Sequence, residues 1–206
     1  MTGDVRPAAY CTIFAGPNGS GKSTLYPALD PVGEFVNADV VARQIAPHDP
    51  AGASMNAGRL VLAKIDNALN QKRSFVYETT LSSRQSIAVM ERCRSLGYEI
   101  ALVYVTLRSP DLNVQRVAER VARGGHHIEE AVIRRRYETA FSRLPSALAL
   151  ADTALIFDNS DIGAVLLLAV EKGHIASKHL DRDTPLHLRL AHAAADALQT
   201  DVEAFF

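Results

Sequence analysis

The sequence of 206 residues has two cysteines and almost no net charge, and each shortage excludes a class of protein. Cys11 and Cys93 belong to no CxxC pair and have no regularly spaced histidines beside them, so neither a disulfide framework nor a zinc site is indicated. A formal net charge of −1 removes the excess of Lys and Arg on which nonspecific nucleic-acid binding depends. We therefore expect no nucleic-acid partner.

The sequence also lacks a segment that could enter a membrane. Residues 1–10 have no apolar core of the kind found in signal peptides. The longest apolar run, Ala164–Val170, is far shorter than the ~18 residues that a bilayer span requires. We therefore expect a cytoplasmic protein that has no membrane partner.

Internal repeats, low-complexity tracts and blocks of charge are absent too, and a chain of this length favours one domain with an appendage. We expect a main domain over residues 1–180, with a helical hairpin at about residues 110–143. A C-terminal helix within residues 181–206 is expected to pack on this domain or on a partner.

Apolar segments without a period of their own alternate with segments of helical period along the first 160 residues. Strands are predicted at residues 9–15, 34–37, 74–77, 98–107 and 153–157. Helices are predicted after residue 22 as far as Pro27 or Pro31, and at residues 39–45, 54–71, 84–96, 110–121 and 129–143. This order predicts an α/β fold with a parallel sheet flanked by helices.

The pattern changes after Asn159, where two short strands at residues 165–170 and 174–177 are predicted to form a small hairpin. A helical alternative for residues 164–170 stays open, because periodicity does not separate the two. A terminal helix opens at Pro185 and carries an apolar stripe at intervals of four residues as far as Val202.

Residues 16–23 match the GxxxxGK[ST] pattern of a P-loop and lie between an apolar strand and a helix. In this motif backbone N–H groups surround a β-phosphate, Lys22 neutralises phosphate oxygens and the Ser23 hydroxyl reaches Mg²⁺. We predict that ATP or GTP binds there with Mg²⁺, and that Asn159 borders the base, although its turn needs no function. The predicted nucleotide-binding residues are Gly16, Asn18, Gly19, Ser20, Gly21, Lys22, Ser23, Thr24 and Asn159.

Neither an NKxD guanine signature nor an apolar run that ends in paired acids is present, so a small-molecule kinase is favoured over a GTPase or a helicase. Asp39 follows a strand at the edge where α/β folds bind ligands, and it could accept a proton from a substrate hydroxyl. Its alternative role is the N-cap of helix 40–45. Glu78, Thr79 and Thr80 follow a buried strand and could bind substrate hydroxyls or hold Mg²⁺ through water, or could simply lead into a helix cap.

Arginines cluster on the two helices that meet at Gly124 and Gly125. A hairpin that carries arginines over a P-loop can neutralise transition-state charge and exclude water, whereas the alternative is a solvated basic face. His126 and His127 are predicted to pack or to cap the loop. The clustered arginines are Arg116, Arg120, Arg123, Arg134, Arg135 and Arg136.

Several segments resemble, in order, the short form of the zeta toxin family of P-loop kinases, over about residues 10–177. They are GPNGSGKST, VNADVVARQIAP, SFVYETTLSS, RVAERVARGGHHI, IRRRYETAF and LIFDNS. The resemblance implies ATP-dependent phosphorylation of a nucleotide-sugar hydroxyl, typically in UDP-N-acetylglucosamine. It further implies toxicity through blocked peptidoglycan precursors, and a protein antitoxin as a partner.

The resemblance also implies roles for individual residues. Lys22 and Ser23 take the phosphate and Mg²⁺ roles, and Asp39 takes that of the catalytic base. Glu78 and Thr79 resemble the substrate-binding pair, to which we add Arg43 and Arg120. Arg123 and Arg136 reproduce the thirteen-residue spacing of the two family arginines and are predicted to be catalytic.

Two alternatives to a sugar-nucleotide kinase stay open. One is a P-loop kinase for another acceptor, such as a nucleoside, a dinucleotide or an antibiotic. The other is a nucleotide-binding regulatory module with weak ATPase activity. The presence of Asp39, Arg123 and Arg136 favours a kinase, because a binding module has no need for a base.

Overall fold

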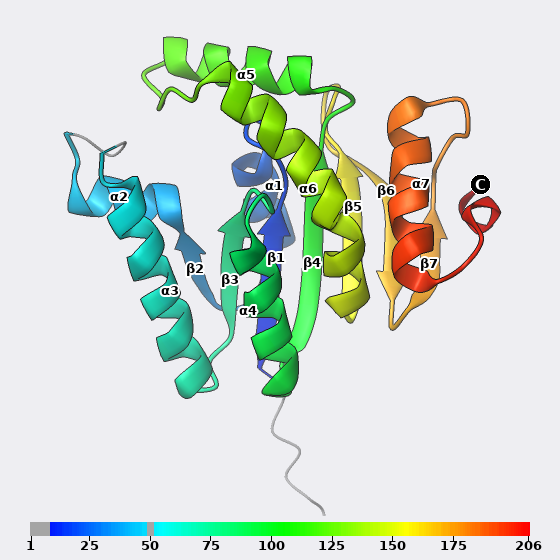
Figure 1. The fold of residues 1–206 in the computed structure, drawn as a ribbon, viewed down its shortest axis with the longest axis horizontal. Helices are drawn as coiled ribbons and strands as arrows, with labels where there is room; N and C mark the ends of the chain where they lie inside the picture. The colour runs from blue at the N-terminus through cyan, green and yellow to red at the C-terminus, as the bar shows by residue number, and fades with distance from the viewer. Residues whose placement is uncertain (1–8, 49–51) are drawn as a thin grey trace, which may run out of the picture.

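The computed structural model describes residues 9–48 and 52–206, and its centre is a seven-stranded sheet (Figure 1). The strand order is β2-β3-β1-β4-β5-β6-β7. The strands are β1 (Tyr10–Ala15), β2 (Glu34–Asn37), β3 (Phe75–Thr79), β4 (Glu99–Thr106), β5 (Thr153–Asp158), β6 (Val165–Glu171) and β7 (His174–Lys178).

The helices alternate with the parallel strands as the sequence predicts. They are α1 (Lys22–Leu29), α2 (Ala38–Ile45), α3 (Ser54–Asn70), α4 (Arg84–Ser95), α5 (Pro110–Ala122), α6 (Glu130–Leu150) and α7 (Pro185–Leu198), followed by the short 3-10 helix η1 (Val202–Phe205). The predicted α/β fold is therefore confirmed. Residues 1–8, which include most of the N-terminal segment without an apolar core, and residues 49–51 lie outside the described residues.

The sheet is mixed, because β5 to β7 are antiparallel neighbours while β2, β3, β1, β4 and β5 pair in parallel. The predicted hairpin thus extends the main sheet, and β5 is not its last strand. The helical alternative for residues 164–170 is wrong, since β6 pairs along its length with β5. The apolar run alone does not distinguish a strand from a helix, and pairing with β5 makes it a strand.

Two helix ends differ from the prediction, whereas α1 ends at Leu29, between the two predicted stops. Helix α1 passes through Pro27, because Leu25, Tyr26 and Leu29 pack on the sheet and offset the lost hydrogen bond. Helix α6 continues to Leu150 through Pro145, seven residues beyond the predicted end. Helix α7 ends where Gln199 turns left-handed at φ 51°, so Val202 belongs to the separate helix η1.

The two faces of the sheet are covered unequally. Helices α3, α4, α6 and α7 lie on one face, and α1 lies on the other (Figure 1). The face covered by four helices buries a large core that includes Ile65, Met90, Phe141 and Leu190. The face covered by α1 buries a smaller cluster of apolar side chains around Phe14. Among the described residues, no helix combines the length and the apolar composition needed to cross a bilayer.

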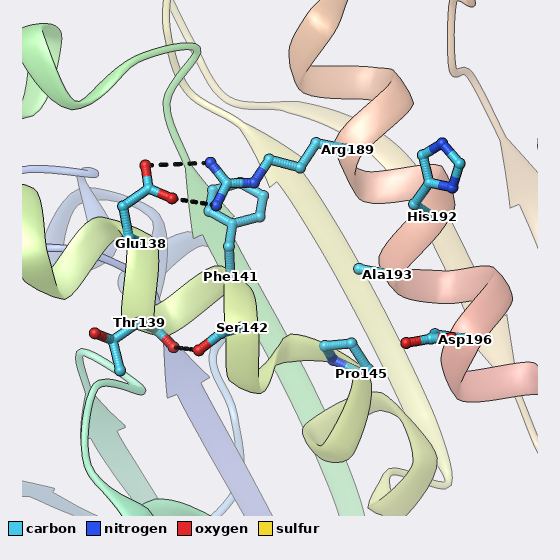
Figure 2. Close-up of a pocket in the computed structure, with 9 residues that line it drawn as sticks. All are labelled: Glu138, Thr139, Phe141, Ser142, Pro145, Arg189, His192, Ala193 and Asp196. Atoms are coloured by element: carbon cyan, nitrogen blue, oxygen red, sulfur yellow. Dashed lines mark hydrogen bonds and ion pairs between the residues drawn. The ribbon is translucent and has the colours of Figure 1, made fainter.

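Helix α7 packs on the second half of α6, as Figure 2 shows. The Arg189 guanidinium lies 4.0 Å from the centre of the Phe141 ring and pairs with the Glu138 carboxylate. A shallow depression of about 660 Å³ lies beside this pair. The ion pair and the ring contact therefore form part of the interface between α6 and α7.

The parallel register decides what meets at the edge where the strands end. Asn37 on β2 lies opposite Glu78 on β3, and Ala15 on β1 lies opposite Thr79. The P-loop follows β1 directly, and α5 crosses above this edge in Figure 1. The polar ends of β2 and β3 therefore face the P-loop beneath the α5–α6 hairpin.

Candidate active site

A cavity of about 680 Å³ opens at this edge of the sheet. Its walls come from four parts of the chain: the P-loop with the start of α1, the β2–α2 junction, the end of β3, and the α5–α6 hairpin. The predicted site residues that line it are Asn18, Gly19, Gly21, Lys22, Ser23, Thr24, Asp39, Arg43, Glu78, Thr79, Arg120, Arg123, Arg136 and Asn159.

Two predicted P-loop residues do not line the cavity, because they shape the loop from behind. Gly16 has φ 147°, and a Cβ there would lie 2.0 Å from the carbonyl oxygen of Val105. Ser20 is fully buried and its hydroxyl has no hydrogen-bond partner among the described residues. Only the backbones of Gly16 and Ser20 are thus available to the site.

Asn159 braces the P-loop. Its Nδ2 donates to the Ser20 carbonyl oxygen at 2.9 Å. A Cβ at Gly21 would lie 2.1 Å from the same nitrogen, and Gly21 is left-handed at φ 91°. The contact therefore depends on glycine at position 21, and it keeps Asn159 at the margin of the cavity, where its contact with a base stays a prediction.

Lys22 lies at the centre of the cavity and is only 7% exposed. Its Nζ donates to the carbonyl oxygens of Gly16 at 2.8 Å and Pro17 at 3.1 Å, and it lies 3.8 Å from Glu78 Oε1. Burial lowers the pKa of Lys22, and the Glu78 and Asp39 carboxylates oppose that shift. A concentrated positive charge in a nearly dry site is suited to binding phosphate oxygens.

Glu78 lies between two donors at the end of β3. Its Oε2 accepts a 2.7 Å hydrogen bond from Asn37 Nδ2, while its other oxygen faces Lys22. The Glu78 side chain is only 14% exposed. Its carboxylate is thus held in one orientation at the cavity wall.

Asp39 does not cap helix α2, and that alternative is wrong. The N-cap is Asn37, whose Oδ1 accepts from the Val40 backbone N–H at 2.9 Å. Asp39 lies in the first helical turn, where the helix dipole favours a negative charge, and its side chain lines the cavity. Its carboxylate is therefore available to a bound molecule.

Thr79 uses its hydroxyl in the turn that follows β3. The hydroxyl accepts from the Leu81 backbone N–H at 3.1 Å and lies 2.8 Å from Ser86 Oγ. Leu81 is buried and left-handed at φ 57°, which is strained for this residue. The Thr79 hydroxyl thus supports that turn from the wall of the cavity.

The arginines divide between the cavity and the outside of the hairpin. Arg136 Nη1 donates to Asn18 Oδ1 at 3.0 Å, so α6 contacts the P-loop directly. Burial lowers the pKa of Arg136, and the Asp39 carboxylate opposes the shift. Arg134, by contrast, is paired outside with Asp111 and Glu130.

The α5 arginines reach the cavity from the other helix. Arg116 donates to the Ser160 carbonyl oxygen at 3.1 Å, and Arg120 donates to that of His126 at 3.1 Å. Arg123 is exposed at the end of α5 and lines the cavity. The face shared by Arg116 and Arg120 therefore turns toward the site.

A second cavity of about 540 Å³ adjoins the first between α2 and the turn of the hairpin. Asp39, Arg43 and Arg120 line both cavities. Gly125 and His126 line only the second, so the backbone and side chain of the loop form its outer wall. Asp39 thus lies at the junction of the two cavities.

The donor set suits a loosely held magnesium ion. Among residues 9–48 and 52–206, no group of three or more His, Cys, Asp or Glu side chains could hold a metal. Mg²⁺ is usually held by one or two protein groups together with substrate phosphates and water. The Ser23 hydroxyl, exposed beside Lys22 in the cavity, fits that pattern.

Sequence reasoning missed Asn37 and did not select Arg116 for the site. Arg116 lines the cavity from the same face as Arg120, and their spacing of four residues was the signal for it. Asn37 stands between a strand and a helix, where asparagine is a preferred N-cap. That preference could have moved the capping role from Asp39 to Asn37.

A family model described as an AAA domain, AAA_33, matches residues 12–142. The chain belongs to this family. The match contains every predicted site residue except Asn159, and the AAA_33 domain here is a P-loop kinase-like domain. An uncharacterized protein of Haemophilus influenzae is 35% identical over 126 residues, which are 61% of this chain and 90% of that protein.

Solved structures of similar fold cover nearly the whole chain. The AvrRxo1-ORF1:-ORF2 structure with ATP has a TM-score of 0.63 at 14% identity, covering 98% of this chain and 77% of that one. A structure of the PezAT chromosomal toxin-antitoxin system of Streptococcus pneumoniae has a TM-score of 0.58 at 14% identity, covering 95% and 88%. At this identity the likeness concerns the fold alone.

Proposed function

We propose that this AAA_33 protein is an ATP-dependent kinase that transfers the γ-phosphoryl group to a hydroxyl of a small molecule. The observation that carries the proposal is the free Asp39 carboxylate, which shares one cavity with Lys22 and Arg136. A kinase needs a carboxylate that receives the hydroxyl proton and cations that neutralise the transferring phosphoryl group. A nucleotide-binding module with weak ATPase activity needs no such carboxylate.

Each side chain has a proposed part in the reaction. Lys22 and the P-loop backbone bind the phosphates of ATP, or of GTP, and the fold shared with a structure solved with ATP supports this nucleotide class. Arg123 and Arg136 neutralise charge on the transferring group. Ser23 holds Mg²⁺, which, when bound, shields the phosphate oxygens. Asp39 accepts the hydroxyl proton.

We propose a sugar nucleotide such as UDP-N-acetylglucosamine as the acceptor, with nucleosides, dinucleotides and antibiotics as alternatives. The resemblance to zeta toxins supports it, and so does the second cavity, whose Arg43 and Arg120 could pair with an anionic part of the acceptor. Glu78 and Thr79 complete the acceptor site. The fold shared with a toxin-antitoxin system supports toxicity and an antitoxin partner.

Incubation with radiolabelled ATP and a panel of UDP-sugars, nucleosides, dinucleotides and antibiotics tests the proposal. We expect one class of acceptor to become labelled by the wild-type protein, and the Asp39→Asn variant to leave it unlabelled. If a class other than UDP-sugars became labelled, the proposed kinase activity would stand and the proposed acceptor would change. Release of phosphate with no labelled acceptor would favour the regulatory module.

A further inference from the structure

Asn37 connects two parts of the site through its side chain. Its Oδ1 accepts from the Val40 backbone N–H at the start of α2, and its Nδ2 donates to Glu78 Oε2 at the end of β3. The β2–β3 register places Asn37 directly opposite Glu78. One side chain therefore connects the first turn of α2 with a carboxylate on the neighbouring strand.

The choice of asparagine is more specific than capping requires. Asn, Asp and Ser all cap helices well. Asparagine ends in both a carbonyl acceptor and an NH₂ donor, whereas aspartate would face Glu78 with a second carboxylate, and serine has one oxygen on a shorter side chain. Capping α2 and donating to Glu78 at once therefore selects asparagine at position 37.

Both groups that Asn37 holds face the cavity. Glu78 is fixed between Asn37 and Lys22, with its second oxygen 3.8 Å from Nζ. Asp39 lies two residues after the cap, so the position of its backbone follows from the capped turn. The hydrogen bond between Asn37 and Glu78 thus links the segment that carries Asp39 to the Glu78 carboxylate.

We propose that Asn37 is a positioning residue that fixes Glu78 and Asp39 relative to each other. The inference rests on the proposed phosphotransfer, in which Asp39 accepts the proton and Glu78 contacts the acceptor. A shift of about 1 Å in a reacting group can cost about 10²-fold in rate. Loss of the link should therefore lower kcat and leave the KM for ATP, which depends on the P-loop, unchanged.

Two variants remove the side-chain NH₂ that reaches Glu78 while keeping a capping oxygen, Asn37→Ser and Asn37→Asp. We expect kcat to fall by about 10-fold to 10²-fold, more for Asn37→Asp because two carboxylates then repel each other. The same changes at Asn67, whose side chain contacts Gln71 on α3 away from the cavity, are matched controls that should leave kcat unchanged. A lower melting temperature with unchanged kcat would reduce Asn37 to a helix cap and overturn the proposal.

A double-mutant cycle tests the route of the effect. In a Glu78→Ala background the link is already lost, so Asn37→Ser should cost little further activity. An equal loss of kcat in both backgrounds would show that Asn37 does not act through Glu78, and the proposal would fail.

Nuclear magnetic resonance of the isotope-labelled full chain separates this inference from the proposed function. The Asn37 side-chain NH₂ signals should move in the Glu78→Ala variant and stay in place in an Asn67→Ser variant. If the protein transferred no phosphoryl group yet these signals moved, the link would stand without the kinase. If the Asn37 NH₂ signals did not move in the Glu78→Ala variant, the hydrogen bond between Asn37 and Glu78 would be refuted, whether or not the protein is a kinase.

Discussion

On the sheet side of the cavity, Glu78 accepts a 2.7 Å hydrogen bond from Asn37 and faces Lys22 at 3.8 Å, whereas on the hairpin side Arg116, Arg120 and Arg136 donate to neutral oxygens. Lys22 is 7% exposed, while Arg120 and Arg123 on α5 are exposed to solvent. One wall is therefore held by neighbouring strands, whereas the other consists of long arginine side chains on two helices.

This difference suits the two sides of the cavity to different roles in the proposed reaction. Strand pairing and the Asn37–Glu78 hydrogen bond hold Glu78 and the start of α2 in place, so in the proposed reaction Asp39 and Glu78 need little reorganisation. Guanidinium groups on long stems can follow a phosphoryl group as its charge moves. Substitutions on the two walls should accordingly differ in the size and the additivity of their effects.

The largest loss is expected from Lys22→Met, which keeps the length of the side chain and removes its charge. Phosphoryl transfer should fall below detection, because Lys22 is the only buried cation among the described residues that line the cavity. A transfer assay with a melting curve as a control checks it. Near-normal transfer would remove the P-loop from the mechanism.

Asp39→Asn removes the carboxylate that we propose as the proton acceptor. Turnover should fall by about 10²-fold to 10⁴-fold while the affinity for ATP persists. Because Asn37 caps α2, the melting temperature should stay close to that of the wild type. Steady-state kinetics and calorimetry measure both, and a stability loss with unchanged turnover would contradict the role of a base.

Arg136→Ala and Arg123→Ala test the hairpin side together. Each should lower turnover by about 10-fold to 10²-fold, the Arg136 change more, since Arg136 is also tied to Asn18 in the P-loop. Because both arginines serve one developing charge, the double variant should lose less free energy than the two single losses combined. Strict additivity would mean that they act separately.

The smallest effects are expected from Arg134→Ala and Arg135→Ala. Arg134 pairs with Asp111 and Glu130 outside the cavity, and Arg135 is exposed on the same helix. Surface ion pairs contribute little, so turnover should stay within about twofold of the wild type. Equal effects at Arg134, Arg135 and Arg136 would leave the cluster a solvated basic face.

Most of the fold was predictable because its signals are local. The P-loop motif and the apolar strand before it each depend on a few adjacent residues. Apart from the far end of α6, the predicted strands and helices of the parallel part lie within two residues of their observed ends. Helix α6 was underestimated, since its second half is held by packing against α7 rather than by its own sequence pattern.

The sequence by itself determined that a P-loop opens an α/β domain, because both depend on hydrophobic period and residue order along one stretch of chain. Only the tertiary structure decided that β6 and β7 extend the same sheet, and that Asn37 rather than Asp39 caps α2. It also decided that Glu78 lies between Asn37 and Lys22. The place of β6 and β7 follows from strand pairing, and the contacts of Glu78 join residues far apart in the sequence, with 41 positions between Asn37 and Glu78. The cap on α2 is a local contact, but asparagine and aspartate cap helices about equally well, so residue type alone does not choose between Asn37 and Asp39.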